Sequence, residues 1–515
     1  MKTISKEEYR SKVYGCWLGK NIGGTLGAPF EGSRSAKDVE FYTHDLARGV
    51  IPNDDLDLQL AWLCAAERFG SAVNAKILAE YWVSAIVPNW AEYGVSKTNL
   101  QIGLQPPLSG SLCNAFKDSN GAWIRSELWA CLMPGHPELA VRFGYEDAIV
   151  DHGDEGVYAE VFTTALESAA FAVSDYEELV QIGLSYIPKD CGVARAVNYA
   201  IEYYKSGMSW KEARVKLLNA IPGSFGGQLR KPNPDHIPQG PWGYDAPSNI
   251  GLTILGWYYG EGDFSKSICI AAGCGEDGDC TCATLGSIMG IILGAEGLPE
   301  KWLVPIGDEI KTACLNLESG LIHVPKTVTE LTDRTCCLMP AFMNGYFNLF
   351  ESGKELSLNE GKSLYDHPTR AWTIKPYLFS DQYPDSFVAF TGENAIFKMQ
   401  VTAAEGVYIG EGQTKKFKIH AENISGFVGN PLWLTLHWIL PEGWYTDQGK
   451  HTAMFLNQYH CGTGNAYGTI RITAGEIKET VTTVLLEIIA NGRPGRIYIP
   501  IQFIRNTEDP NESMR

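Results

Sequence analysis

The sequence has no long hydrophobic run and no excess of positive charge. Its longest apolar stretch, around Leu285 to Ala295, is too short and too rich in glycine to cross a bilayer. The first ten residues, MKTISKEEYR, lack the apolar core of a signal peptide. The formal net charge of −18 argues against nucleic acid or an anionic membrane surface as the main partner. We therefore expect no nucleic-acid partner and no membrane partner.

The cysteines follow no spacing that is typical of a zinc finger or a zinc ribbon. There are 13 of them, an odd number that does not suit a secreted, fully disulfide-bonded chain. Several lie among apolar neighbours, as buried free thiols do, namely Cys16, Cys64, Cys131 and Cys269. We therefore expect a reducing, cytoplasmic location.

The 515 residues are enough for two or three domains, and no internal repeat or low-complexity tract divides them. Up to about residue 370, apolar residues recur at helical spacing. Predicted helices cover Leu56–Phe69, Ala75–Val87, Ala140–Val150, Ala159–Val173, Glu177–Ile187, Gly192–Ser206, Trp210–Ile221 and Thr281–Leu293. We therefore predict an all-α domain over residues 1–350. Its long irregular loops, expected at 96–126 and 222–247, are of the kind that tends to be functional.

After residue 385 the apolar pattern changes to a period of two, which is typical of strands. Strand-like runs rich in β-branched and aromatic residues cover Ser386–Phe390, Ala395–Val401, Lys416–Glu422, Leu432–Leu440, Tyr467–Thr473, Thr480–Ile489 and Arg496–Phe503. This spacing predicts an all-β, Ig-like sandwich over residues 385–510. Residues 351–384 are predicted to be a linker or packing arm.

Two acidic motifs lie more than 200 residues apart, and each opens an apolar helix. Asp277 and Asp279 stand two residues apart on a Gly-rich turn, and Asp54 and Asp55 follow a Pro-preceded turn that includes Asn53. Carboxylates at such helix starts can converge on one hard cation. The pair of motifs predicts a divalent-metal site assembled by the fold, with Asp57 expected to lie behind it or in solvent.

Four separated blocks of this sequence, in order, resemble the ADP-ribosylglycohydrolase family over residues 1 to about 350. The blocks are Gly15–Glu31, Asn53–Asp55 (similar to Thr-Asp-Asp), Asn120–Arg125 followed by Asp151-His152, and Asp277–Cys280 (similar to Asp-Thr-Asp-Thr). The resemblance implies an all-α fold with two Mg²⁺ ions. It also implies hydrolysis of a ribosyl, or related glycosyl, N- or O-glycosidic bond.

The site residues that the resemblance implies fall into three groups. The metal ligands would be Asn53, Asp54, Asp55, Asp277 and Asp279, with Cys280 at the place of the final threonine; the catalytic carboxylates would be Glu31, Asp55 and Asp279; the substrate would bind Asn120, Gly121, Trp123 and His152. Glycosidic cleavage passes through an oxocarbenium-like state, which a positioned carboxylate and an activated water stabilise. Of the tryptophans, Trp123 and Trp242 are the two expected near a sugar or base. Arg125 is expected to hold loops to carboxylates.

Some residues depart from the family pattern. Asn53 and Cys280 replace threonines, and Gly24 stands where many members carry aspartate. A thiol is a poor Mg²⁺ ligand, so one metal position is expected to be weakened, lost or altered in its preference. Asp118 stands in a loop that is Gly-rich in the family, and its charge would repel a diphosphate. This favours a small ribosyl or glycosyl substrate, although an ADP-ribosylated protein also remains open.

Two further readings of the function come from other classes. A catalytically silent family member, acting as a ligand-binding, carbohydrate-binding or structural protein, would tolerate the changes at Asn53 and Cys280. The region from Leu432 to Trp444 resembles Ig-like accessory domains of carbohydrate-active enzymes, so the β domain could itself bind glycans.

Overall fold

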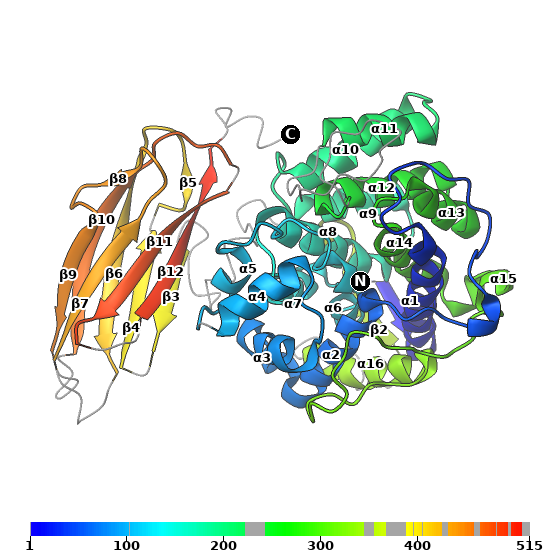
Figure 1. The fold of residues 1–515 in the computed structure, drawn as a ribbon, viewed down its shortest axis with the longest axis horizontal. Helices are drawn as coiled ribbons and strands as arrows, with labels where there is room; N and C mark the ends of the chain where they lie inside the picture. The colour runs from blue at the N-terminus through cyan, green and yellow to red at the C-terminus, as the bar shows by residue number, and fades with distance from the viewer. Residues whose placement is uncertain are drawn as a thin grey trace. The chain divides into compact units, whose positions relative to one another are not determined.

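The computed structural model describes residues 2–101, 103–221, 243–343, 355–366, 388–394, 396–403, 405–424, 431–457, 464–479, 481–492 and 496–506. The chain folds into two compact units, Met1–Asp366 and His367–Arg515 (Figure 1). The first unit is helical apart from one short two-stranded sheet, and the second is all-β where it is described, as predicted. The domain boundaries predicted near residues 350 and 385 fall in segments outside this description and stay predictions.

The described part of the first unit contains sixteen α-helices. They are α1 (Lys6–Gly27), α2 (Asp54–Phe69), α3 (Ala75–Ala85), α4 (Ala91–Gln101), α5 (Leu108–Ser111), α6 (Glu127–Leu132), α7 (Pro137–Ala148), α8 (Asp154–Ala170), α9 (Tyr176–Ser185), α10 (Gly192–Lys205), α11 (Trp210–Ala220), α12 (Ala246–Gly260), α13 (Phe264–Cys274), α14 (Gly278–Leu293), α15 (Glu300–Leu303) and α16 (Val328–Phe342). None of the described helices combines the length and the hydropathy needed to cross a membrane.

The predicted loop at 96–126 was partly wrong, because its first residues belong to α4 and it also contains α5. Periodicity missed α4 because polar side chains occupy its buried face, among them Ser96, Lys97 and Asn99. The Lys97 ammonium donates to the carbonyl oxygens of Ile86 and Pro88. Most of the second predicted loop, residues 222–242, lies outside the described residues.

Helices α1 and α14 pack in direct backbone contact along a line of glycines. A Cβ added at Gly15, Gly19, Gly23 or Gly27 would lie only 2.0 to 2.3 Å from a carbonyl oxygen of α14. Gly15 faces Gly290 and Gly27 faces Gly278, so the two helices run antiparallel. The end of α1 is therefore held against the beginning of α14, where the second acidic motif stands.

A two-stranded antiparallel sheet joins the start of the chain to a distant segment. Strand β1 (Lys2–Ser5) pairs with β2 (Glu355–Leu358), in the region predicted to be a linker or packing arm. Leu356 and Leu358 have no exposed surface, so this segment forms part of the core of the first unit.

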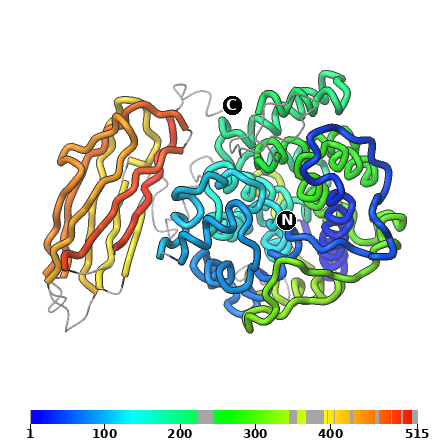
Figure 2. The backbone as a smooth tube through the Cα atoms, in the orientation of Figure 1, coloured from blue at the N-terminus to red at the C-terminus, as the bar shows by residue number. Residues whose placement is uncertain are grey.

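The second unit is a sandwich of two five-stranded sheets, β3-β4-β6-β10-β8 and β5-β12-β11-β7-β9. Its strands are β3 (Val388–Glu393), β4 (Phe397–Ala403), β5 (Tyr408–Ile409), β6 (Thr414–Asn423), β7 (Leu432–Ile439), β8 (Tyr445–Thr446), β9 (His451–Leu456), β10 (Asn465–Thr473), β11 (Val481–Ala490) and β12 (Arg496–Arg505). The inner faces meet through contacts such as the rings of Phe417 and Phe503, 5.5 Å apart. Figure 2 shows the two layers of this unit in the backbone trace. The sequence missed β9, whose alternation is weak because Ala453 and Met454 stand at its centre.

Candidate metal centre

Helix α2 carries the first acidic motif at its N-terminus. Asn53 is the N-cap, and its Oδ1 accepts a hydrogen bond from the Asp55 amide at 2.7 Å. The Asn53 Nδ2 donates to Asp279 Oδ2 at 3.2 Å, across 226 residues of sequence. The two motifs therefore lie side by side, and Asn53 links them. A Cβ at Gly24 would lie 2.8 Å from the Asn53 Nδ2, so the small residue at position 24 leaves room for the asparagine.

The second acidic motif follows a strained turn that is fastened on both sides. Glu276 has a φ of 61°, a left-handed conformation that is uncommon for a residue other than glycine. Its backbone amide donates to the Ser33 carbonyl at 2.7 Å, and its carbonyl accepts from the Gly32 amide at 2.6 Å. Its buried carboxylate accepts a hydrogen bond from Arg214 at 3.0 Å. This anchoring fixes the direction in which Asp277 and Asp279 leave the turn.

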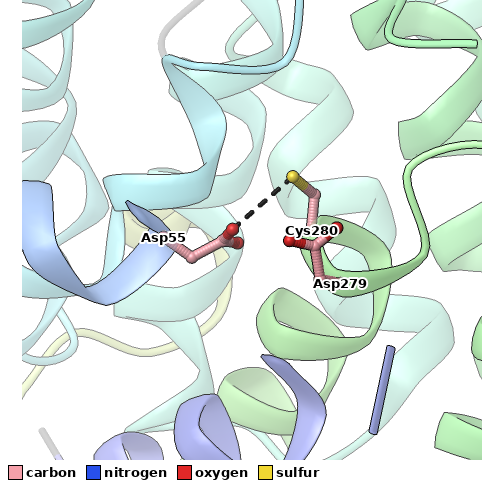
Figure 3. Close-up of side chains that lie close together, drawn as sticks. All are labelled: Asp55, Asp279 and Cys280. Atoms are coloured by element: carbon pink, nitrogen blue, oxygen red, sulfur yellow. Dashed lines mark hydrogen bonds between the residues drawn. The ribbon is translucent and has the colours of Figure 1, made fainter. Parts of the chain in front are cut away.

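Two groups of ligand atoms result from this arrangement. Glu31, Asp277 and Asp279 form one group, and Asp55, Asp279 and Cys280 form the other; within each group the ligand atoms lie within 4.8 Å of one another. Asp279 belongs to both groups. In Figure 3 the side chain of Asp55 comes from one helix and those of Asp279 and Cys280 from another, and they converge. Asp55 is 1 % exposed and Asp279 is 6 % exposed.

Not every oxygen of this cluster is satisfied by the protein. Asp279 Oδ1 accepts no hydrogen bond from a described donor, and the same holds for Asp55 Oδ1. Asp55 Oδ1 lies 3.4 Å from the ammonium of Lys20, in an ion pair. Buried carboxylate oxygens without donors cost free energy unless a cation or a proton reaches them.

Lys20 is a buried cation beside the cluster. It is 1 % exposed and forms an ion pair with Glu127 at 2.6 Å. Burial opposes the charged ammonium, but Glu127 and Asp55 raise the pKa of Lys20 above its ordinary value. Gln59 donates to the other oxygen of Glu127 at 2.8 Å. Lys20 therefore stays charged and fixes the position of Asp55.

The carboxyl groups of the cluster have raised pKa values because burial disfavours their charged forms. Burial, together with the nearby Glu31 and Asp55, raises the pKa of Asp277 to about 7. Burial and the charge of Asp277 raise the pKa of Asp279 well above its ordinary value. Burial also raises the pKa of Asp55 well above its ordinary value, against the pull of Lys20. A bound divalent cation favours the charged form of nearby carboxyl groups and therefore lowers their pKa values. A cluster of buried carboxyl groups is suited to such a cation.

The loop residues predicted to bind substrate stand directly behind the second motif. The Asn120 Nδ2 donates to Asp277 Oδ2 at 2.7 Å, and the Trp123 indole donates to Asn120 Oδ1 at 2.9 Å. The ring of Trp123 has no exposed surface, so it holds Asn120 rather than stacking on a ligand in this structure. Trp242 lies outside the described residues.

His152 is enclosed behind Gly121 and has no exposed surface. Its Nδ1 lies 2.9 Å from Asp151, and its Nε2 lies 3.1 Å from the Ser119 hydroxyl. A Cβ at Gly121 would lie 3.1 Å from His152 Cε1, so the histidine packs against the loop backbone. The structure places His152 as a support of this loop.

Arg125 and Asp57 have structural positions. The buried Arg125 guanidinium donates to Asp147 at 2.8 Å and to Asp151 at 2.6 Å, and also to the Gly121 carbonyl. It therefore holds loops to carboxylates, as the sequence predicted. Asp57 points away from the cluster, because its Oδ2 accepts from the amides of Ala313 and Cys314, each at 2.7 Å.

Glu31 is the exposed member of the cluster. It follows the end of α1, and its Oε1 accepts a hydrogen bond from the Tyr244 hydroxyl at 3.3 Å. An exposed carboxylate next to buried ones marks the side from which solvent and ligands reach the site.

A family model described as ADP-ribosylglycohydrolase matches residues 5–339, which is well over half of the chain. The chain belongs to the ADP-ribosylglycohydrolase family. A solved structure titled "ADP-ribosylglycohydrolase-related protein complex" is similar to it at 16 % identity and a TM-score of 0.40, over 65 % of this chain and 98 % of that one. No curated protein matches the chain.

Sequence reasoning missed several residues of this family member's site. Lys20, Glu127, Tyr93 and Tyr244 each contact a residue of the acidic cluster or its immediate neighbour. The Tyr93 hydroxyl donates to Asp54 Oδ2 at 2.9 Å. The one available signal was Lys20 itself, a lone lysine within the apolar, Gly-rich run GCWLGKNIGG. A charged residue in such a run needs a buried partner.

The donor set of this ADP-ribosylglycohydrolase family member fits a divalent cation. Carboxylate oxygens dominate both ligand groups, and two buried oxygens have no hydrogen-bond donor among the described residues. Oxygen donors of this type suit hard cations such as Mg²⁺. Cys280 is the exception in this set, since its Sγ is a soft donor.

Proposed function

We propose that this protein is a Mg²⁺-dependent glycoside hydrolase that cleaves a ribosyl, or related glycosyl, N- or O-glycosidic bond. Membership of the ADP-ribosylglycohydrolase family suggests hydrolase activity. The observation that carries the proposal is the meeting of carboxylates from α2 and α14, with buried oxygens of Asp55 and Asp279 left without donors. Buried carboxylates that lie this close repel one another when charged, and a cluster with only a structural role would gain nothing from that repulsion.

Metal ions would be held by the two groups that share Asp279. The oxygen ligands within these groups are Glu31, Asp55, Asp277 and Asp279. Asp54, whose Oδ2 accepts a hydrogen bond from Tyr93, lies outside both groups and is a further ligand that the proposal assigns. Asn53 uses its Oδ1 for the Asp55 amide and its Nδ2 for Asp279, so it aligns the ligands. When bound, Mg²⁺ orients sugar hydroxyls and makes a water molecule more acidic.

The proposal assigns the other catalytic roles to side chains of the protein. Glu31 is exposed at the edge of the cluster, where a carboxylate can accept a proton from an attacking water. The Tyr244 hydroxyl fixes Glu31, Asn120 fixes Asp277, and Lys20 fixes Asp55. With the carboxylates of Asp55 and Asp279, Glu31 stabilises the positive charge that develops on the sugar ring during glycosidic cleavage.

The proposed substrate is a small ribosyl or glycosyl compound without a diphosphate. Asp118 stands in the loop that is expected to be Gly-rich in a diphosphate-binding relative, and its Oδ1 accepts a hydrogen bond from the Glu155 amide at 3.1 Å. The neighbouring Lys117 is already paired with Asp154, so its charge is not free to bind phosphate. An ADP-ribosylated protein is the other substrate class to be tested. We also propose a reducing, cytoplasmic location, supported by twelve described cysteines that are all free.

Isothermal calorimetry with Mg²⁺ tests the metal part of the proposal. We expect Asp279→Asn to abolish Mg²⁺ uptake, because it removes a ligand shared by both groups, while circular dichroism shows most helical content intact. Asp38→Asn is the matched control, since the Asp38 side chain is 80 % exposed, pairs with Lys211 and belongs to neither ligand group. Equal Mg²⁺ uptake by Asp279→Asn and the wild type would refute the metal assignment.

A comparison of two substrate classes tests the proposed activity against the other substrate class and against a silent, ligand-binding protein. Release of free sugar from nucleosides, measured by chromatography with and without Mg²⁺, supports the small-substrate proposal. Release from ADP-ribosylated protein, or tight binding of ADP-ribose, would replace that substrate class. The replacements at Asn53 and Cys280 favour a silent, ligand-binding relative, and Mg²⁺ uptake with no turnover of either class would favour that second function.

A further inference from the structure

Cys280 stands in the first turn of α14, where the family motif has a threonine. It is 5 % exposed, and its Sγ lies 3.5 Å from Asp55 Oδ2. Its Sγ, an oxygen of Asp55 and an oxygen of Asp279 lie within 4.8 Å of one another. Figure 3 shows the three side chains converging, with the contact between Cys280 and Asp55 drawn.

The neighbouring Cys282 shows what a packed thiol looks like on the same helix. Its Sγ contacts the carbonyl oxygen of Ile268 at 3.3 Å, and it has no exposed surface. Cys280 instead directs its sulfur at a carboxylate. Asp279, whose buried Oδ1 accepts no hydrogen bond from a described donor, belongs to the same group as Cys280 and Asp55. This unpartnered oxygen is an observation independent of the cysteine, and it calls for a ligand.

We propose that Cys280 Sγ is a metal ligand together with Asp55 and Asp279, and that this position takes a thiophilic divalent cation such as Zn²⁺ or Co²⁺ in preference to Mg²⁺. The inference rests on the proposed metal-dependent function and specifies the ion at one of its two positions. Glu31, Asp277 and Asp279 offer only oxygen atoms and keep the Mg²⁺ preference. The result is an asymmetric pair of sites that share Asp279.

The geometry agrees with a tetrahedral ion of this kind. Metal–ligand distances of about 2.3 Å to sulfur and about 2.1 Å to oxygen, at a tetrahedral angle, separate the two ligand atoms by about 3.6 Å. The Sγ of Cys280 and Oδ2 of Asp55 are 3.5 Å apart. Three protein ligands leave the fourth position open, as in catalytic zinc sites.

Charge also favours a cation at this position. Binding releases the thiol proton to solvent and leaves a thiolate. The divalent cation offsets two of the three negative charges of that thiolate and the two carboxylates, and the Lys20 ammonium, which Asp55 shares with Glu127, lies 3.4 Å from Asp55. Threonine at position 280 would offer a neutral hydroxyl instead, a harder donor that carries no charge.

Cobalt titration of the full-length protein, followed by ultraviolet and visible absorption, tests the inference. We expect the wild type to show a sulfur-to-cobalt charge-transfer band that Cys280→Ser and Cys280→Thr lack. The same variants should keep Mg²⁺ uptake by calorimetry. Their ratio of Zn²⁺ to Mg²⁺ affinity should fall by at least about tenfold, the smallest loss typical when even an outer-shell partner of a metal is removed.

Cys282→Ser is the matched control and should keep the band. The exposed Cys113 and Cys337 could bind cobalt adventitiously, but a band from them would persist in Cys280→Ser. A band of equal strength in the wild type and Cys280→Ser, or Co²⁺ uptake without any band, would overturn the inference while leaving Mg²⁺ uptake intact. If the wild type binds no divalent cation at all, the proposed function fails with it.

Discussion

The contact between α1 and α14 allows a matched test of how the fold positions the metal centre. Gly15 and Gly27 make nearly the same contact at opposite ends of this helix pair. A Cβ would lie 2.3 Å from the Gly290 oxygen at the first position and 2.2 Å from the Gly278 oxygen at the second. The two positions are twelve residues apart, which is about 18 Å along a helix. Only Gly27 lies next to the acidic cluster.

We expect Gly15→Ala and Gly27→Ala to destabilise the protein to a similar extent. A carbon atom needs roughly 3.5 Å from its neighbours, so each alanine must push the helices apart by roughly 1 Å. Overpacking of this kind typically costs about 1–3 kcal/mol. Denaturant unfolding measures the loss directly.

The two variants should differ in metal uptake. Gly27→Ala displaces the first turn of α14 from Glu31, which separates the oxygen atoms of Glu31, Asp277 and Asp279. Gly15→Ala opens the remote end and should leave Mg²⁺ affinity near that of the wild type. Calorimetry on the folded proteins decides this. Equal affinities for the two variants would show that the glycine contact does not position the ligands, and unchanged stability would show that the helices have room to adjust.

Three further predictions concern stability. Removing divalent cations with a chelator should lower the melting temperature, because an ion at about a hundred times its Kd stabilises the folded state by about 2.7 kcal/mol; identical melting with and without chelator would count against a metal centre. Arg125→Met should leave the buried carboxylates of Asp147 and Asp151 without their cation and cost about 3–5 kcal/mol in denaturant unfolding, whereas a cost close to zero would show that the network is dispensable. Glu160 is fully buried, both of its carboxyl oxygens lack a described hydrogen-bond donor, and burial together with Asp147 raises its pKa well above the ordinary value. The folded state therefore holds this proton to a higher pH than the unfolded state, and the unfolding free energy falls as pH rises above about 4.3, the ordinary glutamate pKa. In chelator, Glu160→Gln should lose less stability than the wild type between pH 5 and pH 8, and equal losses would contradict this.

Local patterns predicted most of the long elements. The apolar period of α8, α10 and α11 and the alternation of β6, β7 and β12 identified them within a few residues. The sequence pattern did not predict helices α12 and α13, because they are apolar on nearly every face and therefore show no helical periodicity. The pattern also did not predict helix α4, for the opposite reason, since the buried face of α4 is polar.

The sequence by itself determined the class of each half of the chain and the identity of the acidic motifs. Periodicity indicates which face of an element is buried, and carboxylates next to turn residues can be recognised directly from the amino-acid sequence. Only the tertiary structure decided that Asp55, Asp279 and Cys280 converge, that Lys20 lies beside them, and that Trp123 and His152 support the loop from behind. The position of Asp279 and Cys280 relative to Glu31 depends on how closely α1 approaches α14 and on which carbonyl each glycine meets. Contacts between residues more than 200 positions apart are set by packing of the whole domain, and no local pattern records them.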